Sequence, residues 1–144
     1  MKLVVPENIL REILEEARGH APREVCGLLA GQAGRVMRLY PIPNVSLNPE
    51  TRFEMEPEAQ LAAMREVRRL GLELLGTYHS HPRTPAAPSP RDRRLALYPD
   101  VAHVIVSLAD TDPDVRAFRI TPSGNTPISI VQTGREAKTA GGRT

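Results

Sequence analysis

The segment from Glu73 to Asp92 constrains the fold of this chain more than any other part of its sequence. Glu73–His81 begins apolar and ends on two histidines, which predicts a strand. Pro82–Pro90 contains four prolines, so regular structure is excluded there. Ser89-Pro90-Arg91-Asp92 is typical of a helix start, because Ser caps well, Pro suits the first position and Asp suits the first turn. A stiff loop therefore joins the end of a strand to the start of a helix.

This segment also carries a pattern of metal ligands. Successive side chains alternate faces along a strand, so His79 and His81 are expected on one side and Ser80 on the other. Two imidazoles on one face can bind one ion, and Asp92 can complete the set. Two His and one carboxylate leave a tetrahedral position open to water, as in catalytic zinc sites. We therefore predict one Zn²⁺ per chain, with a bound water, on His79, His81 and Asp92.

Hydrolysis at such an ion also needs a base that accepts a proton from the water and delivers it to the leaving amine. The histidine motif contains no such group. Glu24 comes immediately before the apolar segment Val25–Leu29, which is expected to be a strand that can lie beside Glu73–His81. Glu24 is therefore the candidate general base.

The rest of the chain mixes helical and strand patterns, which indicates an α/β fold. No internal repeat or change in composition marks a second domain, so residues 1–133 are expected to form one domain and residues 134–144 a flexible tail. Helices are expected at 6–18, from about 57 to 70 and from 89 to about 98. Strands are expected at 25–30 and 35–40, as a hairpin, and at 52–55, 73–81, 101–108, 115–120 and 126–132.

Length and composition bound the function. At 144 residues and 40% hydrophobic, the chain is the size of one domain with a substantial core. Cys26 is the single cysteine, so no intramolecular disulfide forms, and the first residues do not read as a signal peptide. No apolar run approaches the roughly 18 residues of a transmembrane helix, and the net charge is only +2. We expect a cytoplasmic protein that binds neither membranes nor nucleic acid.

Two groups of residues together resemble a known family. Glu24-Val25-Cys26-Gly27-Leu28-Leu29 and His79-Ser80-His81-Pro82 with Ser89-Pro90-Arg91-Asp92 are similar to the JAMM (MPN+, JAB1/MPN/Mov34) metalloproteases, in particular the small prokaryotic members. The resemblance implies a single domain with a mixed, curved β-sheet flanked by helices. It implies that His79, His81 and Asp92 bind zinc, that Glu24 holds and deprotonates the water, and that Ser89 helps to stabilise the tetrahedral oxyanion.

The resemblance also implies a substrate. Family members cleave peptide or isopeptide bonds after the C-terminal glycines of ubiquitin or of ubiquitin-like sulfur carriers. The segments between the motifs are short, so the chain is expected to lack the insertions with which eukaryotic deubiquitinases grip linked ubiquitin. We expect a ubiquitin-like or sulfur-carrier partner whose Gly-Gly tail adds as a strand beside a sheet edge. The partner's identity, the leaving group and homodimer formation stay open.

Other interpretations compete with this one. A His-x-His pair alone is more often structural, and Ser89 and Asp92 can serve as a helix start and a site at once. His103 is expected to be a core or edge histidine and Cys26 a buried, inert thiol. A non-catalytic scaffold of the same fold typically loses the ligands that this chain retains. A protein resembling the RadC family shares a similar His-x-His-Pro motif, but the modest charge argues against DNA binding.

Overall fold

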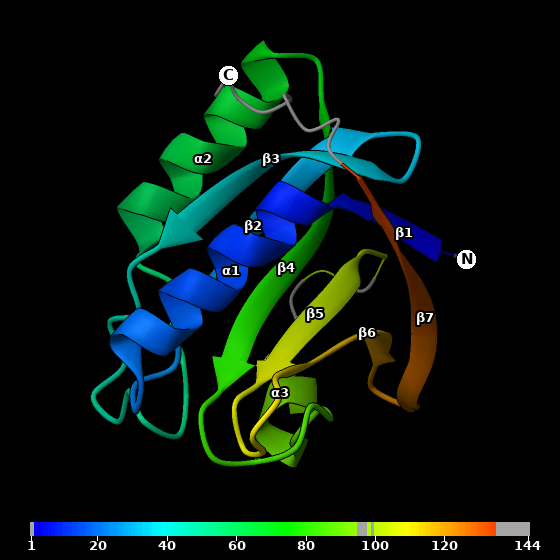
Figure 1. Cartoon of the computed structure of the whole chain (residues 1–144). Coiled ribbons are helices and arrows are strands. Elements are labelled where there is room, and N and C mark those ends of the chain that lie inside the picture. Colours follow the sequence, from blue (N-terminus) through cyan, green and yellow to red (C-terminus); the bar gives the residue numbers. More distant parts are fainter. Residues whose placement is uncertain (1, 95–97, 99, 135–144) are drawn as a thin grey trace.

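The structure is a computed structural model that describes residues 2–94, 98 and 100–134. Within these residues, seven strands and three helices mix along the chain (Figure 1). They are β1 (Lys2–Pro6), α1 (Glu7–His20), β2 (Cys26–Gln32), β3 (Arg35–Ile42), α2 (Pro57–Arg69), β4 (Glu73–His81), α3 (Pro90–Arg94), β5 (Ala102–Ser107), β6 (Asp114–Thr121) and β7 (Gly124–Thr133).

The strands form one mixed sheet that curves into a closed barrel, in the order β1-β3-β2-β4-β5-β6-β7. β1 runs parallel to β7 and β4 runs parallel to β5, whereas β2 is antiparallel to both β3 and β4. The expected hairpin is therefore confirmed, and so is the expected position of the strand at Val25–Leu29 beside Glu73–His81. β1 has no counterpart among the sequence predictions, because its five residues are held by pairing with β7, more than 120 positions away in the chain.

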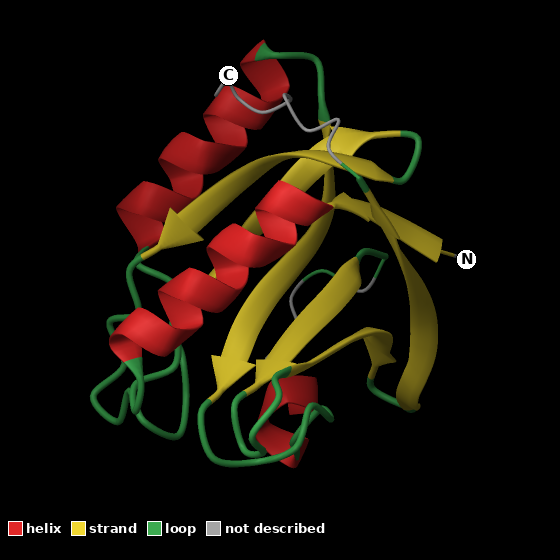
Figure 2. Ribbon diagram, in the orientation of Figure 1, coloured by secondary structure: helices red, strands yellow, loops and turns green. Residues whose placement is uncertain are grey.

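Helices cover both faces of the sheet beside β2 and β4 (Figure 2). The apolar side of α1 packs Ile9, Ile13 and Ala17 into the main core, against residues such as Leu29 and Tyr78. α2 packs Ala63 against Cys26, Leu28 and Ile42 on the other face. Ile9 and Ile13 are almost completely buried, and each contributes about 1.5–3 kcal/mol through removal from water. β4 is thereby held rigidly between two helical layers.

Several boundaries differ from the sequence predictions. β2 continues through Gly31, where a turn was expected, and the turn lies at Ala33 and Gly34. A Cβ on Gly31 would collide with the carbonyl of Arg35, so this glycine permits a close approach within the hairpin. The strand expected at 52–55 is wrong, because only Met55 pairs, in an isolated bridge with Asn44.

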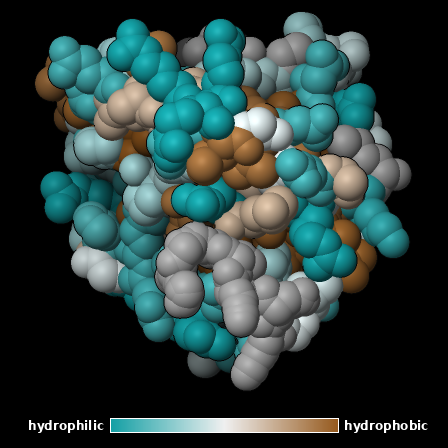
Figure 3. All heavy atoms as spheres, turned by 90° about the horizontal axis from the view of Figure 1, so that it is seen from above, coloured by the Kyte–Doolittle hydropathy of each residue, from teal (hydrophilic) through white to brown (hydrophobic). Residues whose placement is uncertain are grey.

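The ends of two predicted segments lie outside the described residues. α3 is described over Pro90–Arg94, and residues 95–97 of the longer expected helix are not described. β7 ends at Thr133, the last residue of the domain that we propose, and the expected tail beyond residue 134 is likewise outside the described part. No helix in the described part is long and apolar enough to cross a membrane. Viewed from above, the surface is mostly hydrophilic, with scattered apolar groups (Figure 3).

Candidate metal centre

Three predicted ligands converge where β4 ends and α3 begins. The Nε2 atoms of His79 and His81 lie 3.1 Å apart, and Asp92 Oδ2 lies 3.3 Å from the first and 3.1 Å from the second. Both histidines are buried, on the face of β4 opposite Tyr78 and Ser80. The period of the strand and the stiff loop therefore bring the three side chains together, as the sequence predicted.

The hydrogen bonds of this cluster require a cation or a shared proton. His81 Nδ1 lies 2.8 Å from the carbonyl oxygen of Pro85, which can only accept, so Nδ1 carries the proton. A neutral His81 then has no proton on Nε2 for the carboxylate oxygen 3.1 Å away, so this contact is stabilised either by a second proton on His81 or by a cation. Tetrahedral Zn²⁺ with ligands at 2.0–2.1 Å places them about 3.3 Å apart, close to the three separations found here. The residues therefore fit a zinc ion.

In the metal-free protein, electrostatics favour the ligating form of Asp92 and His79 but not of His81. Burial lowers the pKa of His81, but its contacts with Asp92 and with the Pro85 carbonyl outweigh burial and raise this pKa. Burial raises the pKa of Asp92, but hydrogen bonds with His79 and His81 outweigh burial and hold this pKa well below its usual range. Burial lowers the pKa of His79, which favours the neutral imidazole. The ring of His79 also stacks on Phe53, with centroids 4.5 Å apart. A neutral imidazole beside an ionised carboxylate is what a divalent metal needs.

Ser89 and Asp92 cap the start of α3 reciprocally. The amide of Asp92 donates to Ser89 Oγ at 3.0 Å, and the amide of Ser89 donates to Asp92 Oδ2 at 2.9 Å. The predicted helix start is therefore confirmed, and it also orients the carboxylate toward the histidines. Because Ser89 Oγ accepts in this pair, its own proton stays available for another acceptor.

Glu24 lies at the edge of the same cluster. Its side chain is buried at 7% exposure, and its Oε1 atom has no hydrogen-bond partner among the described residues. Burial raises its pKa to about 7, and its charge interacts with those of His81 and Asp92. The pairing of Cys26 with His79 explains this proximity, because Glu24 sits just before β2 at the end where β4 carries its histidines. A carboxyl group with a pKa near neutrality suits a general base.

Hydrogen bonds fix the backbone around Glu24. Ser80 Oγ accepts from the amide of Val25 at 2.8 Å, and the amide of Ser80 donates to the Val25 carbonyl at 3.0 Å. The amide of Glu24 donates to the carbonyl of Pro49 at 2.8 Å. The residue between the two histidines thus ties the candidate base to the strand of the metal ligands.

Sequence reasoning assigned no role to Asn44 or Phe53. The Asn44 amide group donates to the carbonyls of Glu24 and Arg52, at 3.0 and 3.1 Å, and its Oδ1 accepts from the amides of Ser46 and Glu54, both at 3.0 Å. These four bonds connect the candidate base to the loop that carries Phe53. The available signals were the position of Asn44 in a loop rich in proline and the fit of the segments Pro43–Val45 and Arg52–Met55 to the order of motifs in the family that the chain resembles.

His103 and Cys26 were expected to be structural rather than catalytic. His103 is buried and hydrogen-bonds to Thr77 Oγ1 at 3.0 Å and to the Tyr98 carbonyl at 3.1 Å, so it is a satisfied core histidine. It also lines a cavity of about 420 Å³ that reaches His79 and Asp92. Cys26 is buried, and burial raises the pKa of its thiol to about 12, as expected of an inert cysteine.

A closed barrel that brings a His-His-Asp cluster beside a buried glutamate is compatible with a metal-binding hydrolase, and the comparisons identify a hydrolase family. The family described as prokaryotic homologs of the JAB domain matches residues 6–121, and the chain belongs to this family. The predicted resemblance, the α/β fold with its mixed, curved sheet and the assignment as a hydrolase of the JAB family are confirmed.

Two curated relatives carry specific names. The chain is 44% identical over 125 residues to a probable TtuB-protein conjugate cleaving protease of Thermus thermophilus, covering 84% of this chain and 80% of the relative. It is 33% identical over 135 residues to a CysO-cysteine peptidase of Mycobacterium tuberculosis, covering 90% and 92%.

Two solved structures show the same fold. A solution structure of a protein from Desulfitobacterium hafniense has a TM-score of 0.83 at 36% identity, and it covers 92% of this chain and 94% of that one. A JAB1/MPN domain protein from Archaeoglobus fulgidus has a TM-score of 0.60 at 26% identity, with 91% and 99% covered.

Proposed function

We propose that this protein is a zinc-dependent peptidase or isopeptidase that hydrolyses the bond after the C-terminal Gly-Gly of a ubiquitin-like or sulfur-carrier protein. One observation carries the proposal: a buried carboxyl group without a described hydrogen-bond partner, Glu24, lies beside three ligand atoms that all fall within 4.8 Å of one another. Two relatives named as a conjugate-cleaving protease and as a peptidase support the substrate class.

Each residue has a role in this proposal. His79, His81 and Asp92 hold one Zn²⁺, which when bound lowers the pKa of a coordinated water to about 7 and polarises the scissile carbonyl. Glu24 accepts the proton of the attacking water and delivers it to the leaving nitrogen. The Ser89 hydroxyl donates to the oxyanion that develops on the carbonyl, because its own acceptor lone pair already receives the amide of Asp92.

The buried surroundings of Glu24 support these assigned roles. Its pKa of about 7 in the metal-free protein falls when a divalent cation binds nearby, which favours the ionised base. The stacking of Phe53 on His79 shields one side of the cluster from solvent. A dry site strengthens the interactions of charges that develop during the reaction.

The proposal is tested with purified protein and a ubiquitin-like protein fused through Gly-Gly to a reporter. We expect the wild type to bind one zinc and cleave the fusion. Glu24→Gln should keep zinc and lose about 10²–10⁴-fold in kcat, because proton transfer is lost while the ligands remain. His79→Ala should lose both zinc affinity and cleavage.

Three results would contradict parts of the proposal. Wild-type turnover by Glu24→Gln would reject the base, and undiminished zinc affinity in His79→Ala would reject the ligand set. A zinc-loaded wild type that cleaves no Gly-Gly fusion would favour a scaffold, and steeply salt-sensitive binding of duplex DNA in its place would favour the RadC-like alternative.

A further inference from the structure

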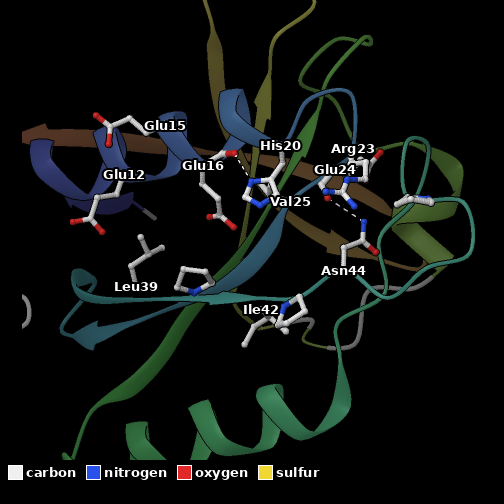
Figure 4. Close-up of a pocket in the computed structure, with 13 residues that line it drawn as sticks. Glu12, Glu15, Glu16, His20, Arg23, Glu24, Val25, Leu39, Ile42 and Asn44 are labelled. Carbon is white, nitrogen blue, oxygen red and sulfur yellow. Dashed lines mark hydrogen bonds between the residues drawn. The ribbon is translucent and has the colours of Figure 1, made fainter.

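Two of the three candidate ligands lie at opposite ends of one loop. His81 ends β4 and Asp92 lies in α3, so residues 82–89 connect them. The candidate base is held from another direction, because the Asn44 amide group donates to the Glu24 carbonyl (Figure 4). The base and the ligands are therefore fixed by separate sets of contacts, and the loop of residues 82–89 governs the ligand side.

Ser107, the last residue of β5, fastens this loop to the sheet. It is buried and is the partner of His81 in the parallel register of β4 and β5. Its hydroxyl donates to the carbonyl of Thr84 at 2.6 Å and accepts from the amide of Ala109 at 3.1 Å. The next amide, that of Leu108, donates to the His81 carbonyl at 3.1 Å. The end of β5 thus holds both the first ligand-bearing end of the loop and its middle.

Three consecutive residues of the loop are held in place. The carbonyl of Thr84 is bound by β5, and the carbonyl of Pro85 accepts from His81 Nδ1 at 2.8 Å. Ala86 is buried in an apolar cluster with Ile105, Phe118 and Ile120. A tilt of the chain at Thr84 would therefore move the Pro85 carbonyl away from the imidazole.

The Pro85 carbonyl determines how His81 presents itself to an ion. A carbonyl oxygen only accepts, so it keeps a proton on Nδ1 and makes Nε2 the ligand atom. Such a bond also fixes the plane of a metal-binding imidazole, and its loss typically weakens metal affinity. The orientation of this one carbonyl is thus part of the metal centre.

Other restraints on the same stretch are weak. Arg83, Thr84 and Pro85 are exposed, so packing does little to fix them. The ion pair of Arg83 with Glu50, at 3.3 Å, is exposed on both sides and contributes little. The bond from the buried Ser107 hydroxyl is shielded from water, and its loss leaves the Thr84 carbonyl without this partner.

We propose that Ser107 is a positioning residue for the metal centre. Its hydroxyl fixes the loop at Thr84, so that the neighbouring Pro85 carbonyl orients His81 and the loop brings Asp92 beside it. Ser107 acts through the loop and not as a ligand. This inference rests on the proposed function, because the zinc ion of that proposal is what the loop is positioned for.

Metal affinity and loop order, measured separately, test the inference. Ser107→Ala removes the hydroxyl. The matched control is Thr121→Val, which removes a hydroxyl that donates to another turn carbonyl, that of Gly124, at 3.2 Å. Competition with a chelator gives the Kd for Zn²⁺. In the metal-free protein, hydrogen exchange reports on the amide of Ala87, which donates to the Pro85 carbonyl at 2.9 Å. Nitrogen NMR of labelled histidine reports on the Nδ1 proton of His81.

The expected changes are local. Ser107→Ala should bind zinc about tenfold more weakly, at the low end of the effects seen for groups that orient a metal-bound histidine. Its Ala87 amide should exchange faster than in the wild type, and the His81 Nδ1 proton signal should broaden. Amides of α1 should exchange as in the wild type, which a general loss of structure would not allow. Thr121→Val should match the wild type in all of these measurements.

Three results would overturn the role of Ser107. They are an unchanged zinc Kd in Ser107→Ala, an equal loss of affinity in Thr121→Val, and unprotected exchange of the Ala87 amide in the metal-free wild type. The third needs no variant, so it tests the inference even if Ser107→Ala fails to fold.

Failure of this inference can be told from failure of the proposed function. Cleavage of the Gly-Gly fusion with a zinc Kd that does not depend on Ser107 would keep the peptidase and reject the positioning role. A zinc Kd that depends on Ser107, without cleavage of any fusion, would keep the positioning role and reject the peptidase. A wild type that binds no zinc would reject both.

Discussion

Individual carboxyl groups in this protein differ in role because their surroundings differ. Glu24 is buried, one of its oxygens has no hydrogen-bond partner in the described part of the chain, and burial raises its pKa to about 7. Asp92 is also mostly buried, but hydrogen bonds with two histidines and with the amide of Ser89 keep it ionised. One group is thereby suited to accept a proton and the other to ligate a cation.

Glu16 provides a prediction about pH and stability at this scale. Burial raises its pKa above the ordinary 4.5, although the Tyr78 hydroxyl and His20 act in the opposite direction. The folded state therefore holds this proton more tightly than the unfolded state, so Glu16 lowers the free energy of unfolding as pH rises through and above 4.5. Glu16→Gln removes the titration, and its stability relative to wild type should rise as pH rises through 4.5 and level off once pH exceeds the raised pKa of folded Glu16.

Urea unfolding of both proteins in chelator, at several pH values, measures this difference. The matched control is Glu15→Gln, at the exposed residue next to Glu16. A difference between Glu16→Gln and wild type that stays constant with pH, or that falls as pH rises, would contradict the assignment of a penalised buried charge.

At the scale of elements, the loop between β3 and α2 is organised by one side chain. Asn44 uses two donor and two acceptor positions to connect Glu24 with Arg52, Ser46 and Glu54. We expect Asn44→Ala to cost about 1–3 kcal/mol of stability, since these backbone groups lose their partner. It should also lower kcat by about 10²-fold with zinc retained, because the base is displaced while the ligands are not.

The control for Asn44 lies in the same loop. Asn48 is exposed, and Asn48→Ala should leave kcat, KM and zinc content near wild-type values. Steady-state kinetics with metal analysis separates the effects. If Asn44→Ala keeps full kcat, or loses activity only together with zinc, Asn44 does not position the base.

Close packing of three strands explains the glycine in the Glu24 motif. A Cβ on Gly27 would collide with the carbonyl of Tyr40 and the ring of Tyr78, which lie over β2. Gly27→Ala is therefore expected to destabilise the fold by about 1–3 kcal/mol through overpacking. Gly19 in α1 has nothing within 4 Å of its would-be Cβ, so Gly19→Ala should stabilise by about 0.5–1 kcal/mol. Thermal unfolding of both variants tests these two predictions, and equal changes in stability for Gly27→Ala and Gly19→Ala would contradict them.

Across the whole molecule, short-range patterns were predictable and long-range closure was not. The alternation of His79 and His81, the proline-rich loop and the helix start at Ser89 are local, so the meeting of His79, His81 and Asp92 could be predicted from the sequence. β1 and its pairing with β7 depend on residues at opposite ends of the chain, and no local periodicity signals that contact. The closed barrel was therefore visible only in the structure.

The same distinction applies to the site. Glu24 could be nominated because its strand was expected beside Glu73–His81, and the pairing of β2 with β4 confirms that proximity. The bonds of Ser80 to Val25 and of Asn44 to Glu24 span 55 and 20 positions and leave no periodic trace in the sequence. The contacts that position Glu24, the proposed base, therefore had to come from the fold.

The central claim is that His79, His81 and Asp92 share one zinc ion. A crystal structure of zinc-loaded protein, with anomalous data collected on both sides of the zinc edge, tests it most directly. The account predicts one peak per chain, about 2.0–2.2 Å from both Nε2 atoms and from Asp92 Oδ2. A zinc-loaded crystal whose peak lies elsewhere, with these three side chains in place and without metal, would contradict it.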